Sequence, residues 1–230
     1  MAEATAKWYD EFYAKGFREA SPWYATALNW LESHGMQGRL LELGCGRGKL
    51  LVELLRRKIA SEEQLYGIDQ SGEAIAAASE VLPHLSIGNI EERLPFENAS
   101  FEVVVMMEVV EHLVRPWQVL REARRILAPH GTLLLSFPNY LNFPWLFVRV
   151  LAELLDRPSW IVLQPIDHMH IMPVFERKLT QCGFRVTGVY GSVFFPPILH
   201  RWEPPGFSGL MNAMNLGRLA FHPVLACEVA

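Results

Sequence analysis

The stretch Leu40-Leu41-Glu42-Leu43-Gly44-Cys45-Gly46-Arg47-Gly48 decides how this 230-residue chain folds. An apolar strand runs into an acidic residue and three alternating glycines, and leucines at helical spacing follow. A second apolar strand then ends in Asp69. A glycine-rich turn lets a ligand approach the backbone closely, and an acid after the second strand can bind two ribose hydroxyls. The stretch therefore predicts a site for a nucleoside cofactor.

The spacing of the glycines separates two classes of cofactor. The dinucleotide fingerprint is G-x-G-x-x-G, but Lys49 stands where its third glycine would be. The pattern G-x-G-x-G behind Glu42, followed by Asp69, resembles motif I and the next acid of class I S-adenosylmethionine-dependent methyltransferases. This resemblance implies that Glu42 and the three glycines shape the methionine pocket of S-adenosylmethionine and that Asp69 binds its ribose. Those glycines are Gly44, Gly46 and Gly48.

Two further segments carry the same resemblance. Residues 88–105 resemble G-D-A-x-x-L-P-F-x-x-x-S-F-D-x-V, and residues 129–139 resemble K-P-G-G-x-L-x-x-S-x-P-N. Asn89 stands where the family usually has an aspartate, and its side-chain oxygen can accept the same hydrogen bond from adenine without a charge. The resemblance implies that Asn89 and Ile90 bind the adenine and that the backbone of Met107 lies near the sulfonium.

The alternation of predicted strands and helices indicates the α/β class, with a Rossmann-like, mostly parallel seven-stranded sheet covered by helices on both faces. Strands are predicted at 39–43, 64–69, 84–88, 101–107, 131–137, 184–191 and about 222–230. Helices are predicted at 47–58, 71–81, 116–127 and 173–182. The resemblance extends over roughly residues 38–191 and implies that the last strand is antiparallel. We expect a single domain, residues 1–230, whose cofactor-binding core is residues 38–137.

Charge and composition narrow the choice of partners and compartment. The net charge is −4 and the pI is about 6.1, so no overall basic field favours nucleic acid. The cysteines Cys45, Cys182 and Cys227 are scattered and predict neither a disulfide framework nor a metal site. The N-terminus has no basic-then-apolar signal pattern, and no charge-free run reaches about 18 apolar residues. These features predict a cytoplasmic protein.

Two apolar segments, residues 139–170 and 192–220, interrupt the alternation of strands and helices. Insertions at these positions commonly form a lid over the acceptor in the family that the chain resembles, so we expect an apolar lid for a hydrophobic or aromatic acceptor. The alternative is that the insertions pack on each other and on the sheet. Peripheral docking on a membrane is less favoured, because the polar face lacks an excess of lysine and arginine.

The N-terminal segment has two interpretations that the sequence leaves open. Trp8-Tyr9-Asp10-Glu11-Phe12-Tyr13 resembles the Y-Y-D-x-x-Y segment that folds over the cofactor in many relatives. The alternative is a packing helix in which the aromatic side chains make only apolar contacts.

Histidines are the first candidates for acid–base chemistry. A sulfonium is already a strong methyl donor, so catalysis is mostly alignment in a dry site, but an O- or N-acceptor must also lose a proton. His112 follows the fourth predicted strand beside the transfer point, and His168 and His170 precede the last core helix, where an extended segment would point both the same way. We predict His112 and His168 as the catalytic residues. The other histidines are interpreted as surface or packing residues: His34, His84, His130, His200 and His222.

A metal site is an alternative at the same place. In a helical turn, Glu108, Glu111 and His112 would share one face, and His168 or His170 would complete a set of four oxygen and nitrogen ligands. This E-x-x-E-H pattern resembles the metal site of small-RNA 2′-O-methyltransferases and an arrangement in ubiquinone-pathway O-methyltransferases. Relatives without a metal also carry V-x-E-H here, where the glutamate caps the next helix and the histidine lines the pocket. The prediction therefore assigns no metal.

The resemblance implies S-adenosylmethionine-dependent methyl transfer to a small hydrophobic or aromatic acceptor, with O-transfer favoured over N- or C-transfer. A non-catalytic accessory protein resembling MetW is the alternative, suggested by Ser136-Phe137-Pro138-Asn139 and the apolar insertion after it. The pair Glu111-His112 argues against this alternative, because MetW-like chains generally lack it. Lys49 argues against a nucleotide-dependent oxidoreductase.

Overall fold

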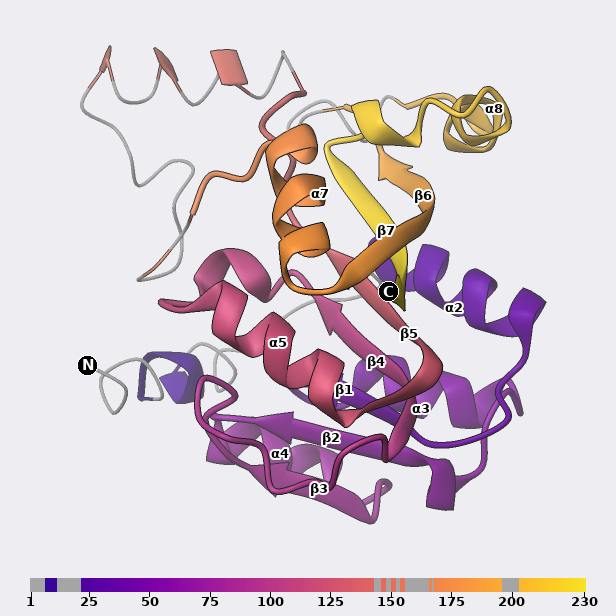
Figure 1. The fold of residues 1–230 in the computed structure, drawn as a ribbon, viewed down its shortest axis with the longest axis vertical. Coiled ribbons are helices and arrows are strands. Elements are labelled where there is room, and N and C mark those ends of the chain that lie inside the picture. The colour runs from indigo at the N-terminus through magenta and orange to yellow at the C-terminus, as the bar shows by residue number, and fades with distance from the viewer. Residues whose placement is uncertain are drawn as a thin grey trace.

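A seven-stranded β-sheet forms the centre of the computed structural model (Figure 1). The structure describes residues 7–11, 22–142, 146–147, 150–151, 154–155, 166, 168–195 and 203–230. The strands are β1 (Leu40–Leu43), β2 (Leu65–Asp69), β3 (His84–Ile87), β4 (Phe101–Met107), β5 (Leu127–Ser136), β6 (Phe184–Val193) and β7 (His222–Val229), in the spatial order β3-β2-β1-β4-β5-β7-β6. The first five strands pair in parallel, and β7 is antiparallel to both β5 and β6. The predicted α/β fold with an antiparallel last strand is confirmed.

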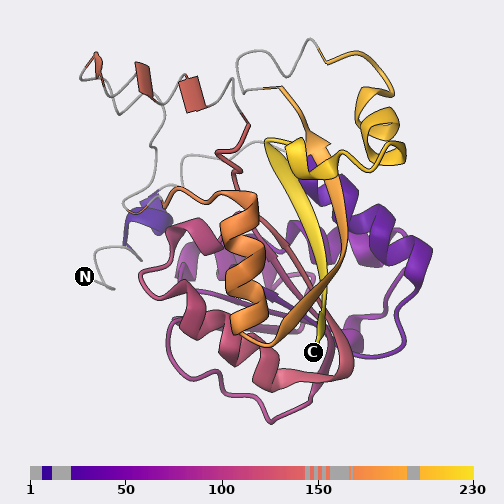
Figure 2. The same cartoon turned by 45° about the horizontal axis from the view of Figure 1, so that its top comes forward.

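Helices cover both faces of this sheet. They are α2 (Pro22–His34), α3 (Lys49–Arg56), α4 (Gly72–Ala78), α5 (Pro116–Ile126), α7 (Met172–Gln181) and α8 (Phe207–Ala213), with single turns η1 (Glu62–Gln64), η2 (Val110–His112) and η5 (Gly217–Leu219). Because successive strand residues point to opposite faces, Leu41 and Leu43 pack with α5 and α7, whereas Leu40 packs with α2 and α3. Figure 1 and Figure 2 show α7 (orange) and α2 (indigo) on opposite sides of the sheet.

Three elements differ from the sequence-based prediction. Helix α2 was not predicted, although Pro22 at its start and the buried side chains of Ala27, Leu28 and Leu31 are helical signals. Helix α8 was also missed. Strand β5 begins at Leu127, several residues earlier than predicted, because the Pro-His-Gly sequence inside it is typical of a turn. None of the described helices has the length and apolar character needed to span a bilayer.

Two asparagines join the bases of the two insertions. The side-chain amide of Asn139, just after β5, donates to the carbonyls of Arg218 at 3.0 Å and Ala220 at 3.2 Å. The amide of Asn142 donates to the carbonyl of Phe194 at 3.0 Å. The bases of the insertions therefore pack on each other, as one of the two interpretations predicted.

Farther along the first insertion, apolar side chains are exposed. The described examples are Leu141, Phe147, Val150, Leu151, Leu154 and Leu155. The rest of this insertion is outside the described residues, as are Phe12, Tyr13 and His200.

The topology places the predicted site residues along one edge of the sheet. The carboxyl ends of β1, β2 and β4 lead into Gly44, Gln70 and Glu108, and the residue Asn89 follows β3 closely. Because β7 runs antiparallel, its first residue, His222, lies at this same edge. Ligands of open α/β sheets bind at the carboxyl ends of the strands.

Candidate functional site

The glycine loop after β1 is folded back onto β2. The amides of Gly44 and Cys45 both donate to the carbonyl of Ile68, at 2.8 and 3.2 Å, and the amide of Gly48 donates to the carbonyl of Cys45 at 2.9 Å. Gly44, Gly46 and Gly48 have φ values of 72°, 51° and 66°. L side chains rarely adopt this left-handed conformation, so the alternating glycines are what allow the turn.

Asp69 closes the loop from the end of β2. Its Oδ2 accepts a hydrogen bond from the Gly46 amide at 2.8 Å, and its Oδ1 accepts one from the Ser71 amide at 2.9 Å. Burial raises the pKa of this carboxyl, and the two backbone hydrogen bonds oppose that rise. A carboxylate has about four acceptor positions, so Asp69 can still accept hydrogen bonds from two ligand hydroxyls.

Glu42 is a buried carboxylate beneath the same loop. The side chain is only 1% exposed, and neither of its oxygens has a hydrogen-bond partner among the described residues. Burial raises its pKa well above the usual range, and the charge of Asp69 raises it further. Because buried charges are normally paired, this acid fits a ligand that brings a positive charge.

Glu42→Gln is expected to make the melting temperature less dependent on pH. Because the folded state of the wild type holds the Glu42 proton to a higher pH than the unfolded state does, its stability falls as the pH rises above the usual carboxyl pKa of 4.5. The variant should therefore melt above the wild type at about pH 8, by about 2–4 °C for each kcal/mol gained. The two should converge at about pH 4.5. Thermal scans with exposed Glu80→Gln as the control test this, and parallel curves for wild type and variant would contradict it.

Asn89 and Ile90 follow strand β3, which lies beside β2 at this edge of the sheet. The Asn89 side-chain oxygen accepts from the Glu91 amide at 3.0 Å, which closes a tight turn, and Ile90 is buried. The Glu91 carboxylate in turn accepts from the amides of Val114 and Arg115 at 3.1 and 2.9 Å, before helix α5. The Asn89 oxygen keeps a second lone pair for a ligand.

The N-terminal segment reaches the same edge. Asp10 Oδ1 accepts from the Ser71 hydroxyl at 2.6 Å and from the Glu73 amide at 3.2 Å, so it adds an acceptor at the start of helix α4. Burial raises the pKa of the Tyr9 phenol, and the charges of Glu111 and Asp69 raise it further. Residues 7–11 therefore lie against the start of helix α4 beside Asp69, a position that agrees with both interpretations of this segment.

Three of the predicted histidine positions come together near η2. His112 Nδ1 lies 2.7 Å from the Ile166 carbonyl oxygen, and its Nε2 lies 3.5 Å from Glu111 Oε1. The backbone amide of His168 donates to the Glu111 carbonyl at 2.8 Å, and the rings of His168 and His170 are 6.4 Å apart. His168 is exposed, whereas His170 is buried.

His170 is held in apolar surroundings. Its ring lies 4.9 Å from Phe175, 5.6 Å from Phe137 and 6.1 Å from Trp117, and its Nε2 has no partner among the described residues. Burial lowers its pKa to about 4, and the charge of His168 contributes. This ring is therefore neutral at physiological pH.

Glu108 does not join Glu111 and His112 in a metal cluster. Its Oε1 accepts from the Ser136 hydroxyl at 2.7 Å, and its Oε2 lies 2.7 Å from His222 Nδ1. In the part of the chain that the structure describes, no three histidine, cysteine, aspartate or glutamate side chains are grouped to hold a metal ion. The structure thus does not support the alternative of a metal at the E-x-x-E-H sequence.

His222 is the residue at this edge that sequence reasoning passed over. It was interpreted as a surface or packing residue, but it is 8% exposed and in contact with Glu108. No local signal could have identified the contact, because it depends on the pairing of β5 with β7.

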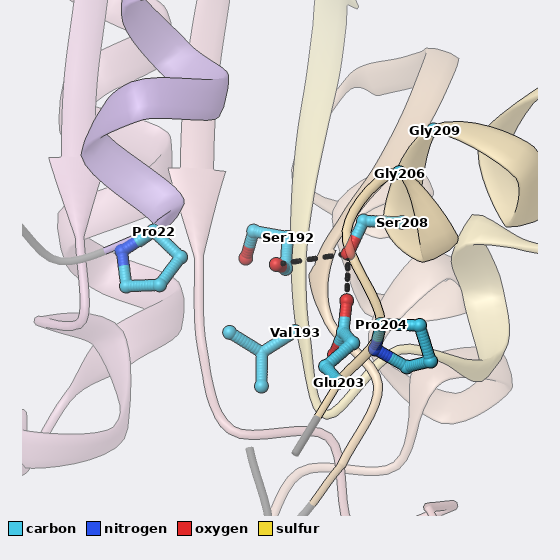
Figure 3. Close-up of a pocket in the computed structure, with 8 residues that line it drawn as sticks. All are labelled: Pro22, Ser192, Val193, Glu203, Pro204, Gly206, Ser208 and Gly209. Carbon is cyan, nitrogen blue, oxygen red and sulfur yellow. Dashed lines mark hydrogen bonds between the residues drawn. The ribbon is translucent and has the colours of Figure 1, made fainter. Parts of the chain in front are cut away.

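A cavity of about 390 Å³ opens beyond the end of β6 (Figure 3). It is lined by Pro22, Ser192, Val193, Glu203, Pro204, Gly206, Ser208 and Gly209. The Glu203 carboxylate accepts from the Phe194 amide at 3.0 Å and from the Ser208 hydroxyl, which fixes the segment before α8. This cavity lies at the same edge of the sheet as the glycine loop but on the far side of β4, β5 and β7.

Comparisons with known proteins match the part of the chain that builds this edge. A family model described as a methyltransferase domain matches residues 41–135. The ubiquinone biosynthesis O-methyltransferase of Acinetobacter baylyi is 26% identical over 215 residues, which cover 87% of this chain and 86% of that protein.

Two solved structures have the same fold. The methyltransferase in a complex with the Trm112 methyltransferase activator of Haloferax volcanii has a TM-score of 0.66 at 19% identity, covering 98% of this chain and 97% of that one. An S-adenosylmethionine-dependent methyltransferase of Thermotoga maritima has a TM-score of 0.65 at 20% identity, covering 90% and 89%.

Proposed function

Because this chain belongs to the class I S-adenosylmethionine-dependent methyltransferases, we propose that it methylates an oxygen of a small hydrophobic or aromatic molecule. The observation that carries this proposal is the likeness to an O-methyltransferase over 87% of the chain, together with the apolar insertions beside the transfer edge. One domain, residues 1–230, would do this work. Residues 38–137 would bind the cofactor, and residues 139–170 and 192–220 would enclose the acceptor.

The roles proposed for the cofactor-binding residues follow from their chemistry. Glu42 would face the ammonium of the methionine part, because a buried carboxylate without a partner favours a cation. Asp69 would accept hydrogen bonds from the ribose hydroxyls with its free lone pairs. The backbones of Gly44, Gly46 and Gly48 would leave room for the ligand beside these acids.

The remaining cofactor contacts lie farther along the edge. Asn89 and Ile90 would hold the adenine through an amide oxygen and an apolar contact. The backbone of Met107, the last residue of β4, would lie near the sulfonium. S-adenosylmethionine supplies a methyl group that its sulfonium already activates for transfer.

His112 and His168 are proposed to line the acceptor on one side. His112 Nδ1 faces a carbonyl oxygen, so this nitrogen carries a proton and the ring orientation is fixed. His168 is exposed, so its ring can exchange a proton with solvent. Together they would orient the acceptor and conduct protons out of the site.

Calorimetric titration with S-adenosylmethionine and separately with NAD, each with and without a chelator, tests the cofactor assignments. Binding of S-adenosylmethionine alone, unchanged by the chelator, is the expected result. A screen of lipophilic phenols and aromatic acids by transfer of a labelled methyl group then tests the acceptor class. Binding without transfer to any acceptor would favour the accessory-protein alternative, and N-methylated products would overturn O-transfer.

A further inference from the structure

A partly buried carboxylate, that of Glu108, lies next to the proposed methyl-transfer point and has no part in the functions assigned above. Glu108 follows Met107 directly, and its φ of 55° is in the left-handed region that side chains disfavour. Its amide donates to the Ser136 carbonyl at 3.2 Å and approaches the Ser136 hydroxyl at 3.1 Å. The Ser136 hydroxyl donates back to Glu108 Oε1 at 2.7 Å. The hydrogen bond at Oε1 thereby fixes the direction of the second carboxylate oxygen, Oε2. Residues with a strained backbone, such as Glu108, gather at functional sites.

His222 stands opposite that second oxygen. Its Nδ1 lies 2.7 Å from Glu108 Oε2, and the two side chains are only 10% and 15% exposed. The imidazole packs on Trp23 with ring centres 4.3 Å apart and on Phe221 with ring centres 4.2 Å apart. The aromatic walls and the carboxylate together hold the ring in one orientation.

The carboxylate also determines where the proton of the neutral ring sits. Two lone pairs at 2.7 Å would repel each other, which favours a proton on Nδ1 in the neutral ring, although the contact with Glu108 lacks the alignment of a hydrogen bond. Nε2 then has the free lone pair, and the Glu108 carboxylate lies close enough to balance a positive charge on the ring. This is the arrangement in which a histidine accepts a proton and its partner stabilises the imidazolium.

His112 is the other histidine near the transfer point that could accept this proton. Its Nδ1 lies 2.7 Å from the Ile166 carbonyl oxygen, and its Nε2 lies 3.5 Å from Glu111 Oε1.

The position of the pair relative to the acceptor side fits a role in the reaction. Strand β7 is two strands from β4, which is about 10 Å at the usual strand spacing. The Ser192 hydroxyl donates to the His222 carbonyl at 2.5 Å, and Ser192 also lines the cavity in Figure 3. The pair therefore lies between the strand that leads to Met107 and the cavity beside the second insertion.

We propose that His222, oriented by Glu108, accepts the proton that the acceptor hydroxyl releases during methyl transfer. The acceptor oxygen forms the bond to the methyl carbon with a lone pair, and the carbon–sulfur bond breaks with its electrons staying on sulfur. The hydroxyl proton passes to His222 Nε2, and the Glu108 carboxylate balances the imidazolium. This inference rests on the proposed O-transfer.

Two phenols of different acidity test the step. At about pH 8, unsubstituted phenol keeps its proton, because its pKa is about 10 like that of tyrosine, whereas 4-nitrophenol is largely ionised. His222→Gln should lower kcat for phenol by about 10²–10⁴-fold and leave kcat for 4-nitrophenol nearly unchanged. Glu108→Gln should show the same selectivity with a smaller loss, on the order of tenfold or more. Exposed His34→Gln is the matched control and should behave as the wild type.

Further measurements separate a structural role from this one. Added imidazole should restore phenol turnover in His222→Ala, and all variants should bind S-adenosylmethionine as the wild type does. Equal losses for both phenols without rescue would overturn the role of His222, as would an unchanged rate in His222→Gln. Either result would leave the proposed O-transfer standing. A wild type that methylates neither phenol nor any other hydroxyl acceptor would overturn the proposed O-transfer, and this inference with it.

Discussion

Replacing Asp69 with alanine is expected to weaken S-adenosylmethionine binding by about 1.5–3 kcal/mol, roughly 10- to 150-fold in Kd. The side chain would lose its hydrogen bonds with the ribose hydroxyls. The Gly46 and Ser71 amides would also lose the hydrogen bonds that they now donate to the Asp69 carboxylate, at 2.8 and 2.9 Å. The cofactor loop would therefore lose both a direct contact and part of its preorganisation. Calorimetric titration of the folded variant with S-adenosylmethionine measures the change.

The control for this experiment separates binding from folding. Each buried amide left without a partner costs about 1–3 kcal/mol of stability, so the variant must be titrated well below its melting temperature. Asp69→Asn keeps one oxygen for the amides but lacks the charge, and it should fall between wild type and alanine. Asp10→Ala, which removes an acceptor from Ser71 but none from Gly46, should change the Kd much less. A Kd in Asp69→Ala equal to that of the wild type would refute the ribose assignment.

Gly44→Ala is expected to destabilise the glycine loop strongly, and Gly35 offers a matched comparison. Both glycines have a φ of 72°. A Cβ at Gly44 would lie 2.6 Å from Val109 Cγ2, whereas a Cβ at Gly35 would meet nothing within 4 Å. The left-handed backbone should cost each variant about 1–2 kcal/mol, and the overlap with Val109 should add about 1–3 kcal/mol to Gly44→Ala alone.

Urea unfolding of the two single variants and of the double variant Gly44→Ala/Val109→Ala measures the cost of the left-handed backbone and the cost of the overlap with Val109. The double variant removes the atoms that overlap, so it should recover part of the loss after the cost of Val109→Ala itself is subtracted. S-adenosylmethionine binding should be weakened in Gly44→Ala and unchanged in Gly35→Ala. If the two single variants lose the same free energy of unfolding, the loop relaxes around the methyl group and the steric argument is wrong.

Much of the fold was predictable because its signals are local. The apolar strand before Gly44, the acid that ends β2 and the Pro116 that starts α5 each fix a backbone conformation within a few residues. Helix α2 escaped prediction although its buried face is regular, and β5 was cut short because Pro129-His130-Gly131 is typical of a turn rather than a strand.

The sequence by itself determined the cofactor loop, the parallel strands that lead to it and the resemblance to class I methyltransferases. Only the tertiary structure decided which partner each carboxylate meets: Glu108 turns to Ser136 and His222 instead of joining Glu111 and His112. A short pattern fixes backbone dihedrals and the face on which a side chain lies, because these depend on near neighbours. Contacts between distant segments depend on the pairing of β5 with β7 and on the packing of α2 against the sheet, which no local pattern encodes.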